Sequence, residues 1–94
     1  MSATTMAPNQ FVLSAFAFLA EDDARLRGLL DLAGLTPDQA KIALIQDEPG
    51  FASHIATYLL SDESWARRYA ERQGLSPDQL AKLAHDVGHE PLMT

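Results

Sequence analysis

The fold of this chain depends on one stretch, Gly34-Leu35-Thr36-Pro37-Asp38-Gln39, which ends one helix and begins the next. Glycine is favoured just past a helix C-terminus because, having no Cβ, it adopts the left-handed conformation that this position requires. The Thr36 hydroxyl can then cap the following helix, with Pro37 at the first helical position and Gln39 completing a capping box. The stretch therefore predicts two helices joined by a short turn.

The same stretch returns 40 residues later as Gly74-Leu75-Ser76-Pro77-Asp78-Gln79, with serine in place of threonine. A shift of 40 residues without a gap also aligns Phe18-Leu19 with Tyr58-Leu59, and Asp22-Asp23 with Asp62-Glu63. The chain thus has the pattern of two tandem three-helix units. Because a solenoid normally needs three or more repeats, we expect the two units to close on each other as one compact bundle with approximate two-fold symmetry.

Apolar spacing and turn signals together predict an all-α fold of about six short helices. The expected helices span residues 9–20, 23–33, 37–46, 51–60, 63–73 and 77–87, with Asn9 capping the first. In the third helix, we expect Ala40, Ala43 and Leu44 to be buried, with Ile42 or Ile45 extending that face. Residues 9–87 then form a single helical domain between a disordered tail of residues 1–8 and a flexible tail of residues 88–94.

The composition fits one small folded domain. The chain has 94 residues, of which 47% are hydrophobic, a net charge of -6 and no cysteine. The negative charge disfavours binding to phosphate backbones and anionic membranes, and the lack of cysteine excludes disulfides and thiolate metal sites. The N-terminus lacks a basic signal region, and the first apolar run, Phe11 to Ala20, is too short to span a bilayer. We therefore expect a cytoplasmic protein that does not bind membranes and is a poor candidate for nucleic-acid binding.

This order of motifs resembles a family of short, all-helical bacterial proteins of unknown function. The family pattern is an apolar helix ending in Phe-Leu-Ala, an acidic dipeptide, Arg-Leu, a Gly-Leu-x-Pro turn, a Pro-x-Phe break, and a second acidic pair before another Gly-Leu-x-Pro. Between residues 15 and 84, the matching positions are Phe18-Leu19-Ala20, Asp22-Asp23, Arg25-Leu26, Gly34-Leu35-Thr36-Pro37, Pro49-Gly50-Phe51, Asp62-Glu63 and Gly74-Leu75-Ser76-Pro77. Asp23 stands where the pattern has proline, a departure that a helix start tolerates. The resemblance implies a helical fold and a bacterial origin, and it carries over no catalytic residue.

No residue pattern in the chain predicts catalysis, a metal or a cofactor. His85 and His89 lie four residues apart beside Glu90, but Gly88 interrupts the helix that a metal site at this spacing needs. For His54, which lies among apolar residues, a half-buried histidine is the simpler explanation. The carboxylate clusters lie at helix junctions, where capping explains them: Glu21-Asp22-Asp23, Asp47-Glu48 and Asp62-Glu63. We therefore predict that the protein is not an enzyme.

The Gly-Leu turns also resemble the joint of a helix-turn-helix unit, in which two helices meet at a short glycine-containing turn. A helix that recognises DNA needs Arg, Lys, Asn or Gln side chains to contact phosphates and base edges. The expected helix at residues 37–46 offers only Gln39, Lys41 and Gln46, and it begins with Asp38. A degenerate helix-turn-helix regulator that binds nucleic acid is therefore the alternative hypothesis.

The leading hypothesis is a small protein-interaction module, an adaptor or regulator without catalytic activity. Arg67, Arg68 and Arg72 lie near Trp65, and arginine beside an exposed aromatic side chain is typical of interfaces. Alternatively, Arg68 and Arg72 pair with nearby acids such as Glu71, and Trp65 packs in the core.

The first expected helix is apolar nearly all the way round, so it is either a central core helix or an association surface. The repeat aligns Arg25 with Trp65, and we expect Arg25 to be exposed. The candidate interface residues are Trp65, Arg68, Arg72, Phe11 and Val12. Their expected partner is an unidentified protein or a second copy of the chain.

Overall fold

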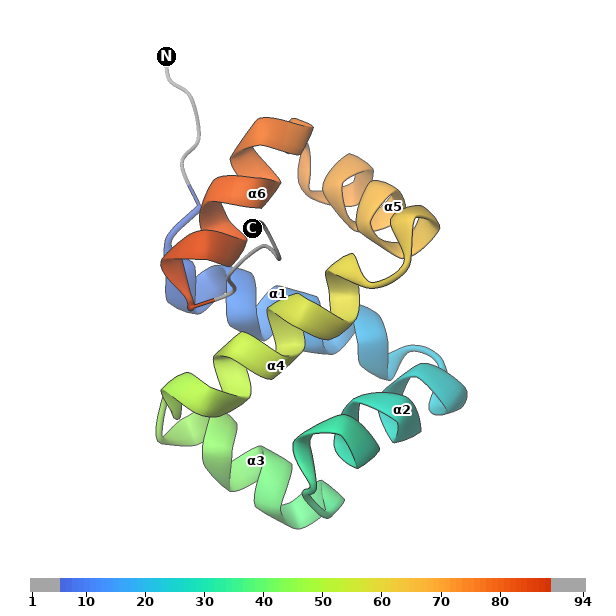
Figure 1. Cartoon of the computed structure of the whole chain (residues 1–94), viewed down its shortest axis with the longest axis vertical. Coiled ribbons are helices and arrows are strands. Elements are labelled where there is room, and N and C mark those ends of the chain that lie inside the picture. The colour runs from blue at the N-terminus through green and yellow to red at the C-terminus, as the bar shows by residue number, and fades with distance from the viewer. Residues whose placement is uncertain (1–5, 89–94) are drawn as a thin grey trace, which may run out of the picture.

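The computed structural model describes residues 6–88, and these form six α-helices with no β-strand (Figure 1). The helices are α1 (Pro8–Ala20), α2 (Asp23–Ala33), α3 (Pro37–Ile45), α4 (Pro49–Leu60), α5 (Glu63–Gln73) and α6 (Pro77–Asp86). The predicted all-α fold of six short helices is confirmed. The tails predicted at residues 1–8 and 88–94 lie mostly outside the described residues. None of the described helices is long and apolar enough to cross a membrane.

Helices α1 and α4 pack against each other at the centre of the molecule and make its most extensive helix contact. In Figure 1, α5 and α6 lie on one side of this central pair, and α2 and α3 lie on the other. Helix α3 packs against α4, and α6 packs against α1. The last helix of each half of the chain therefore contacts the first helix of the other half. The bundle is compact, with a radius of gyration of 12.6 Å.

The core surrounds the central pair and is closed by an aromatic cluster. Its largest fully buried side chains are Tyr69, Phe11, Leu19, Leu29, Ile55 and Leu59. The Tyr69 ring meets the rings of Phe11 and Phe18 edge-on, with centroids 5.8 Å apart in each pair. Its hydroxyl also shares a hydrogen bond with Ser14 of α1. Tyr69 thus attaches α5, in the second half of the chain, to α1 in the first.

Both Gly-Leu turns adopt the predicted conformations. Gly34 and Gly74 are left-handed residues with φ of 72° and 70°, and they end α2 and α5. The Thr36 and Ser76 hydroxyls accept the backbone N–H three positions further on, and both capping boxes are complete. The local signals of the sequence therefore set the ends of four helices correctly.

Acidic residues cap two helices, as expected. Asp22 accepts two backbone N–H groups of α2 at 2.8 and 3.2 Å, and Asp62 accepts two of α5 at 2.9 and 3.3 Å. A hydrogen bond from the Ser64 hydroxyl is the main cause that lowers the pKa of Asp62. Glu48 stands at the cap position of α4, but its side chain makes no capping hydrogen bond. Capping therefore does not explain the Asp47-Glu48 cluster.

Two helices begin earlier than the sequence analysis indicated. Helix α1 starts at Pro8 with Ala7 at the cap position, so the prediction that Asn9 is the cap is wrong. Helix α4 starts at Pro49 rather than at Phe51. In both cases proline occupies the first helical position, where its missing N–H group is not needed. Both helices are therefore extended by the proline that precedes the expected start.

Candidate protein-interaction surfaces

Trp65 and Arg68 of α5 lie together at the surface, beside residues of α2 and α4. Trp65 is half-buried against the Tyr58 ring, with centroids 5.3 Å apart, and Arg68 is exposed. The two side chains line a cleft of about 340 Å³, together with Asp22, Ala24, Arg25 and Tyr58. The sequence analysis missed Tyr58 and Arg25 as members of this surface.

Arg25 is half-buried, so the prediction that it is exposed is wrong. Its guanidinium carbon lies 4.6 Å from the centroid of the Phe18 ring and 6.0 Å from that of the Trp65 ring. The Arg25 Nε atom is buried and has no hydrogen-bond partner. Attraction between the cation and the ring faces compensates for this loss of hydration. The expected repeat aligns Arg25 with Trp65. Two equivalent positions can lie close together when they are near a two-fold axis, and this alignment was the one signal in the sequence for their contact.

Arg72 is bound within the protein rather than free for a partner. Its two terminal nitrogens donate to the carboxylate oxygens of Glu21 at 2.8 and 2.7 Å. These hydrogen bonds lower the pKa of Glu21 below its ordinary value of 4.5. The pairing with nearby acids that we weighed does occur, but with Glu21 at the end of α1 instead of Glu71. The ion pair attaches α5 to α1.

Phe11 is fully buried, so its assignment to an interface is wrong. Helix α1 is the central helix, with neighbours on several sides, and the Phe11 side chain packs against Tyr69. Val12 is only half-buried, and it lines a groove that α1 and α4 form with the end of α6. Of the two candidates on α1, the structure therefore leaves only Val12 near the surface.

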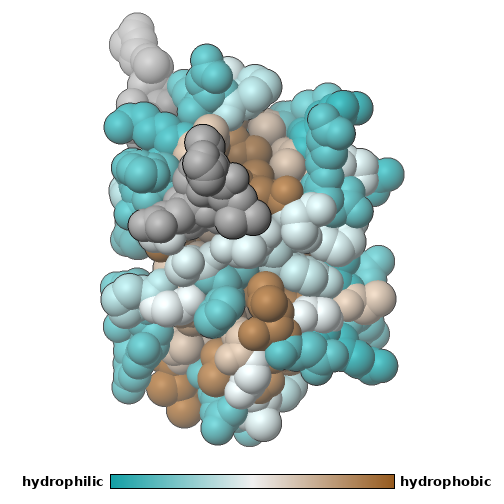
Figure 2. All heavy atoms as spheres, viewed as in Figure 1, coloured by the Kyte–Doolittle hydropathy of each residue, from teal (hydrophilic) through white to brown (hydrophobic). Residues whose placement is uncertain are grey.

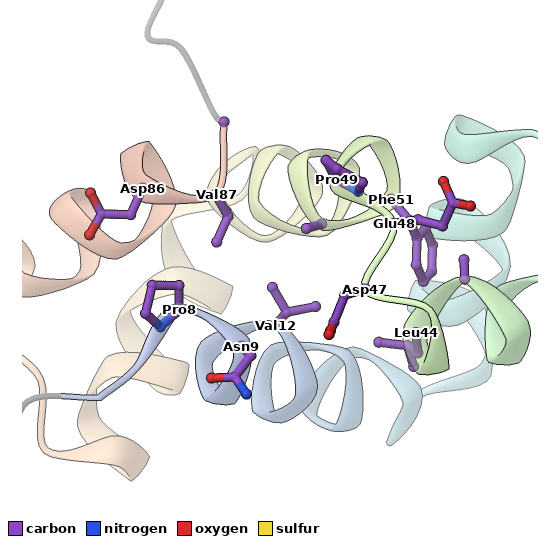
Figure 3. Close-up of a pocket in the computed structure, with 13 residues that line it drawn as sticks. Pro8, Asn9, Val12, Leu44, Asp47, Glu48, Pro49, Phe51, Asp86 and Val87 are labelled. Atoms are coloured by element: carbon purple, nitrogen blue, oxygen red, sulfur yellow. The ribbon is translucent and has the colours of Figure 1, made fainter.

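Figure 3 shows this groove, which has a volume of about 390 Å³ and lies between α1, the α3–α4 loop and the end of α6. Val12 and Val87 point into it from opposite sides, and Leu44 and Phe51 also line it. Its acidic residues are Asp47, Glu48 and Asp86, and no lysine, arginine or histidine is among the lining residues. The groove is thus lined mainly by apolar and acidic side chains.

The outer face of α3 carries two of the four large hydrophobic side chains that are exposed within residues 6–88. Ile45 is 82% exposed and Ile42 is 52% exposed, so the prediction that one of them extends the buried face is wrong. Helix α3 lies at the edge of the bundle and turns its small residues, Ala40 and Ala43, toward the core. Figure 2 shows hydrophobic atoms gathered over this helix, in the lower part of the view. We call Ile42 and Ile45 the α3 face.

A hollow of about 380 Å³ lies beside the α3 face and is lined in part by Ile42, Leu35, Phe51 and His54. His54 is half-buried there, as expected. The hollow and the acidic groove share Ala43, Glu48 and Phe51. The two depressions therefore border the same α3–α4 loop.

The surface of α3 also bears on the helix-turn-helix hypothesis. Helices α2 and α3 do meet at a left-handed glycine, but α3 exposes Ile42 and Ile45, and Lys41 is its only cationic side chain. Within residues 6–88, no group of three His, Cys, Asp or Glu side chains is placed to hold a metal ion. His89 and Glu90, considered above as ligands, lie outside the described residues.

The chain belongs to DUF3572, a family of proteins of unknown function, whose family model matches residues 5–89. The resemblance to a family of unknown function is consistent with this match. A comparison with curated proteins and with solved structures finds no match.

Proposed function

For this member of a family of unknown function, we propose a role as a non-catalytic protein-interaction module that contacts its partner through the α3 face. The exposure of Ile45 and Ile42, at 82% and 52%, carries this proposal. Isolated exposed apolar residues are common, but two β-branched side chains three positions apart lie side by side on one helix. An apolar patch beside a hollow and bordered by polar residues is typical of protein–protein contacts.

We also propose that the two halves of the bundle are related copies of one three-helix unit. Helices α5 and α6 begin 40 residues after α2 and α3, and the caps at Asp22 and Asp62 have similar backbone angles, with φ of -126° and -124°. The positions of Ile42 and Ile45 correspond to Lys82 and His85 in α6. A polar residue is therefore compatible with the fold at these positions. The isoleucines of α3 are best explained by a function that α6 does not share.

The cleft around Trp65 and Arg68 is a second proposed contact. The cleft has two cationic side chains, Arg25 and Arg68, beside the aromatic rings of Tyr58 and Trp65, and this combination suits an acidic partner surface. Arg72 has no place in this contact, because Glu21 already binds it. On the sequence grounds given above, we further propose a cytoplasmic location and no cofactor.

The test is a capture experiment from a nuclease-treated lysate of the source organism, with chemical cross-linking and mass spectrometry. The wild-type protein should retain a stoichiometric protein partner. The variant Ile42→Lys/Ile45→His, which gives α3 the residues of α6, should lose it while keeping its helical circular dichroism. The control Leu13→Lys removes a leucine that is 53% exposed on α1 and should keep the partner.

Retention of the same partner by the α3 variant would contradict the assignment of the α3 face. The variant Trp65→Ala/Arg68→Glu tests the second contact in the same experiment, and it should also lose the partner. An electrophoretic shift of DNA at low salt would instead favour the nucleic-acid alternative, since phosphate binding weakens as salt rises.

A further inference from the structure

We infer that the groove in Figure 3 binds a basic amphipathic segment of the partner protein. Apolar side chains of that segment would enter the groove, and its lysine or arginine side chains would pair with the carboxylates of the groove. The inference rests on the proposed function, because the groove and the α3 face border the same loop.

The inside of the groove is suited to apolar side chains. Val12, Leu44 and Val87 pack partly against the core and remain half-exposed to solvent within the groove. Its volume of about 390 Å³ lies within the range of about 300 to 1,000 Å³ that is typical of binding pockets. Covering these side chains would remove apolar surface from water, which stabilises a complex.

The carboxylates determine the charge of the occupant. In Figure 3, Asp47 lies inside the groove between Val12 and Leu44, whereas Asp86 and Glu48 lie at its two ends with their carboxylates directed outward. None of the thirteen lining residues is cationic, so no side chain within the groove neutralises these carboxylates. A neutral or acidic occupant would remove the Asp47 carboxylate from water without pairing it, which is unfavourable. A segment with cationic side chains would pair with Asp47 inside the groove, and its ends could reach Asp86 and Glu48.

The net charge of the whole chain also favours a basic occupant. At -6, two copies of the protein repel each other, which disfavours a second copy as the occupant. The same charge attracts a basic segment and speeds its association. The occupant that the charges favour is therefore a different, basic protein segment.

Asp47 lies just past the end of α3 in a backbone conformation that glycine adopts more readily. It has φ of 52°, which is a left-handed conformation. Glycine adopts this conformation readily, asparagine and aspartate adopt it occasionally, and other residues adopt it rarely. The Asp47 N–H donates to the Leu44 carbonyl at 3.2 Å, and the Glu48 N–H donates to the Ala43 carbonyl at 3.0 Å. This is the hydrogen-bond pattern of a helix end at which glycine is the usual residue. Glycine would fit this backbone, so replacing Asp47 by glycine removes the carboxylate from the groove without straining the helix end.

The experiment uses two synthetic amphipathic peptides with leucine at the same positions and either lysine or glutamate at all others. Binding to the full-length protein is followed by backbone amide chemical shifts in NMR spectra. The lysine peptide should shift the amide signals of Val12, Ala52 and Val87, and the glutamate peptide should leave them unchanged.

The Asp47→Gly variant should have opposite effects on binding and stability. Its Kd for the lysine peptide should rise about fivefold, the effect of losing one partly exposed ion pair. Its Tm should rise, because glycine relieves the left-handed backbone. The control Asp31→Asn removes one negative charge from α2, outside the groove, and should change the Kd by less than about twofold.

Three results would overturn the inference: equal binding of both peptides, shifts confined to residues outside the groove, and equal Kd changes in the Asp47 and Asp31 variants. Concentration-dependent shifts at the groove without peptide would also overturn it, in favour of a second copy. If the lysine peptide fails but the Ile42→Lys/Ile45→His variant loses its captured partner, only this inference fails. If the lysine peptide binds but that variant keeps its partner, the α3 contact fails instead.

Discussion

Gly28 lies where the Tyr58 side chain of α4 crosses α2. A Cβ atom at Gly28 would lie 2.8 Å from Tyr58 Cζ and closer still to the phenolic oxygen. Glycine inside a helix is normally less stable than alanine by about 1 kcal/mol. Its presence here is explained by the close approach of Tyr58, which in turn supports the Trp65 ring. Because Gly28 has no Cβ, the Tyr58 side chain can take the position in which it lines the cleft beside Trp65.

The Gly28→Ala substitution should therefore lower the free energy of unfolding by about 1 kcal/mol, measured by urea denaturation, although alanine favours helices. The fluorescence emission of Trp65, the only tryptophan, should change because Tyr58 must move. In the control Gly50→Ala, a Cβ atom meets nothing within 4 Å, and the free energy of unfolding should not fall. Equal stability of the two variants would contradict this account.

Tyr69 makes the free energy of unfolding fall with rising pH in the alkaline range. Burial raises the pKa of its phenol above the ordinary value of 10.0, and the hydrogen bond with Ser14 opposes this to a smaller extent. Since the folded pKa exceeds the unfolded pKa, the folded state keeps a proton that the unfolded chain has already lost. This contribution is fully present below about pH 10 and is lost as the pH rises through the folded pKa.

We expect the free energy of unfolding to fall as the pH rises above about 10 and through the folded pKa, and the Tyr69→Phe variant to lack the Tyr69 contribution to this fall. At neutral pH that variant should be less stable by about 1 kcal/mol, because it lacks the hydrogen bond between the Tyr69 and Ser14 hydroxyls. The Ser14→Ala variant keeps the buried phenol and should keep the alkaline fall. Chemical denaturation at a series of pH values tests all three proteins, and an unchanged slope in Tyr69→Phe would refute the assignment.

At the scale of the helices, the caps of α3 and α6 are matched parts of the structure. Thr36 and Ser76 have φ of -82° and -79° and accept equivalent hydrogen bonds. Both helices are short, at 9 and 10 residues, so their ends make up a large part of each. Loss of either cap should therefore affect the whole bundle.

The variants Thr36→Ala and Ser76→Ala should each lower the free energy of unfolding by about 1 kcal/mol. The exchange Thr36→Ser/Ser76→Thr keeps both hydroxyl groups and should change it by less than about 0.5 kcal/mol. Thermal and urea denaturation provide the measurements. A cap variant that is as stable as the wild type would show that the corresponding helix end does not depend on its hydroxyl.

At the scale of the whole molecule, neither half of the chain completes its own core. Helix α3 packs on α4, α6 packs on α1, and the central contact joins α1 to α4. The buried Tyr69 of the second half lies against Phe11 and Phe18 of the first. Separation of the halves would expose most of these apolar surfaces to water.

We therefore expect fragments 1–47 and 48–94 to be largely unfolded as separate monomers. An equimolar mixture should recover the helical circular dichroism of the intact chain, with a Tm that rises with concentration. The control is each fragment alone at the same total concentration. A cooperative thermal transition of either isolated fragment at low concentration would mean that one half suffices as a folding unit.

The sequence alone determined the helix ends at the two Gly-Leu turns and at the acidic caps of α2 and α5, because these depend on residues a few positions apart. The Gly34 and Gly74 turns, the Thr36 and Ser76 caps and the acidic caps at Asp22 and Asp62 could all be predicted. The all-α class and the six helices followed from them. The closeness of Trp65 and Arg68 was also predictable, since both lie on one helix.

Only the tertiary structure decided which side of each apolar helix is buried. Phe11 and Ile45 both stand in helices that are apolar on several sides, so periodicity could not select a face. Phe11 is covered because α1 lies at the centre, and Ile45 is exposed because α3 lies at the edge. The contacts of Arg25 with Phe18 and of Arg72 with Glu21 likewise join separate helices. Such contacts depend on how helices pack across the bundle, which no local pattern of residues encodes.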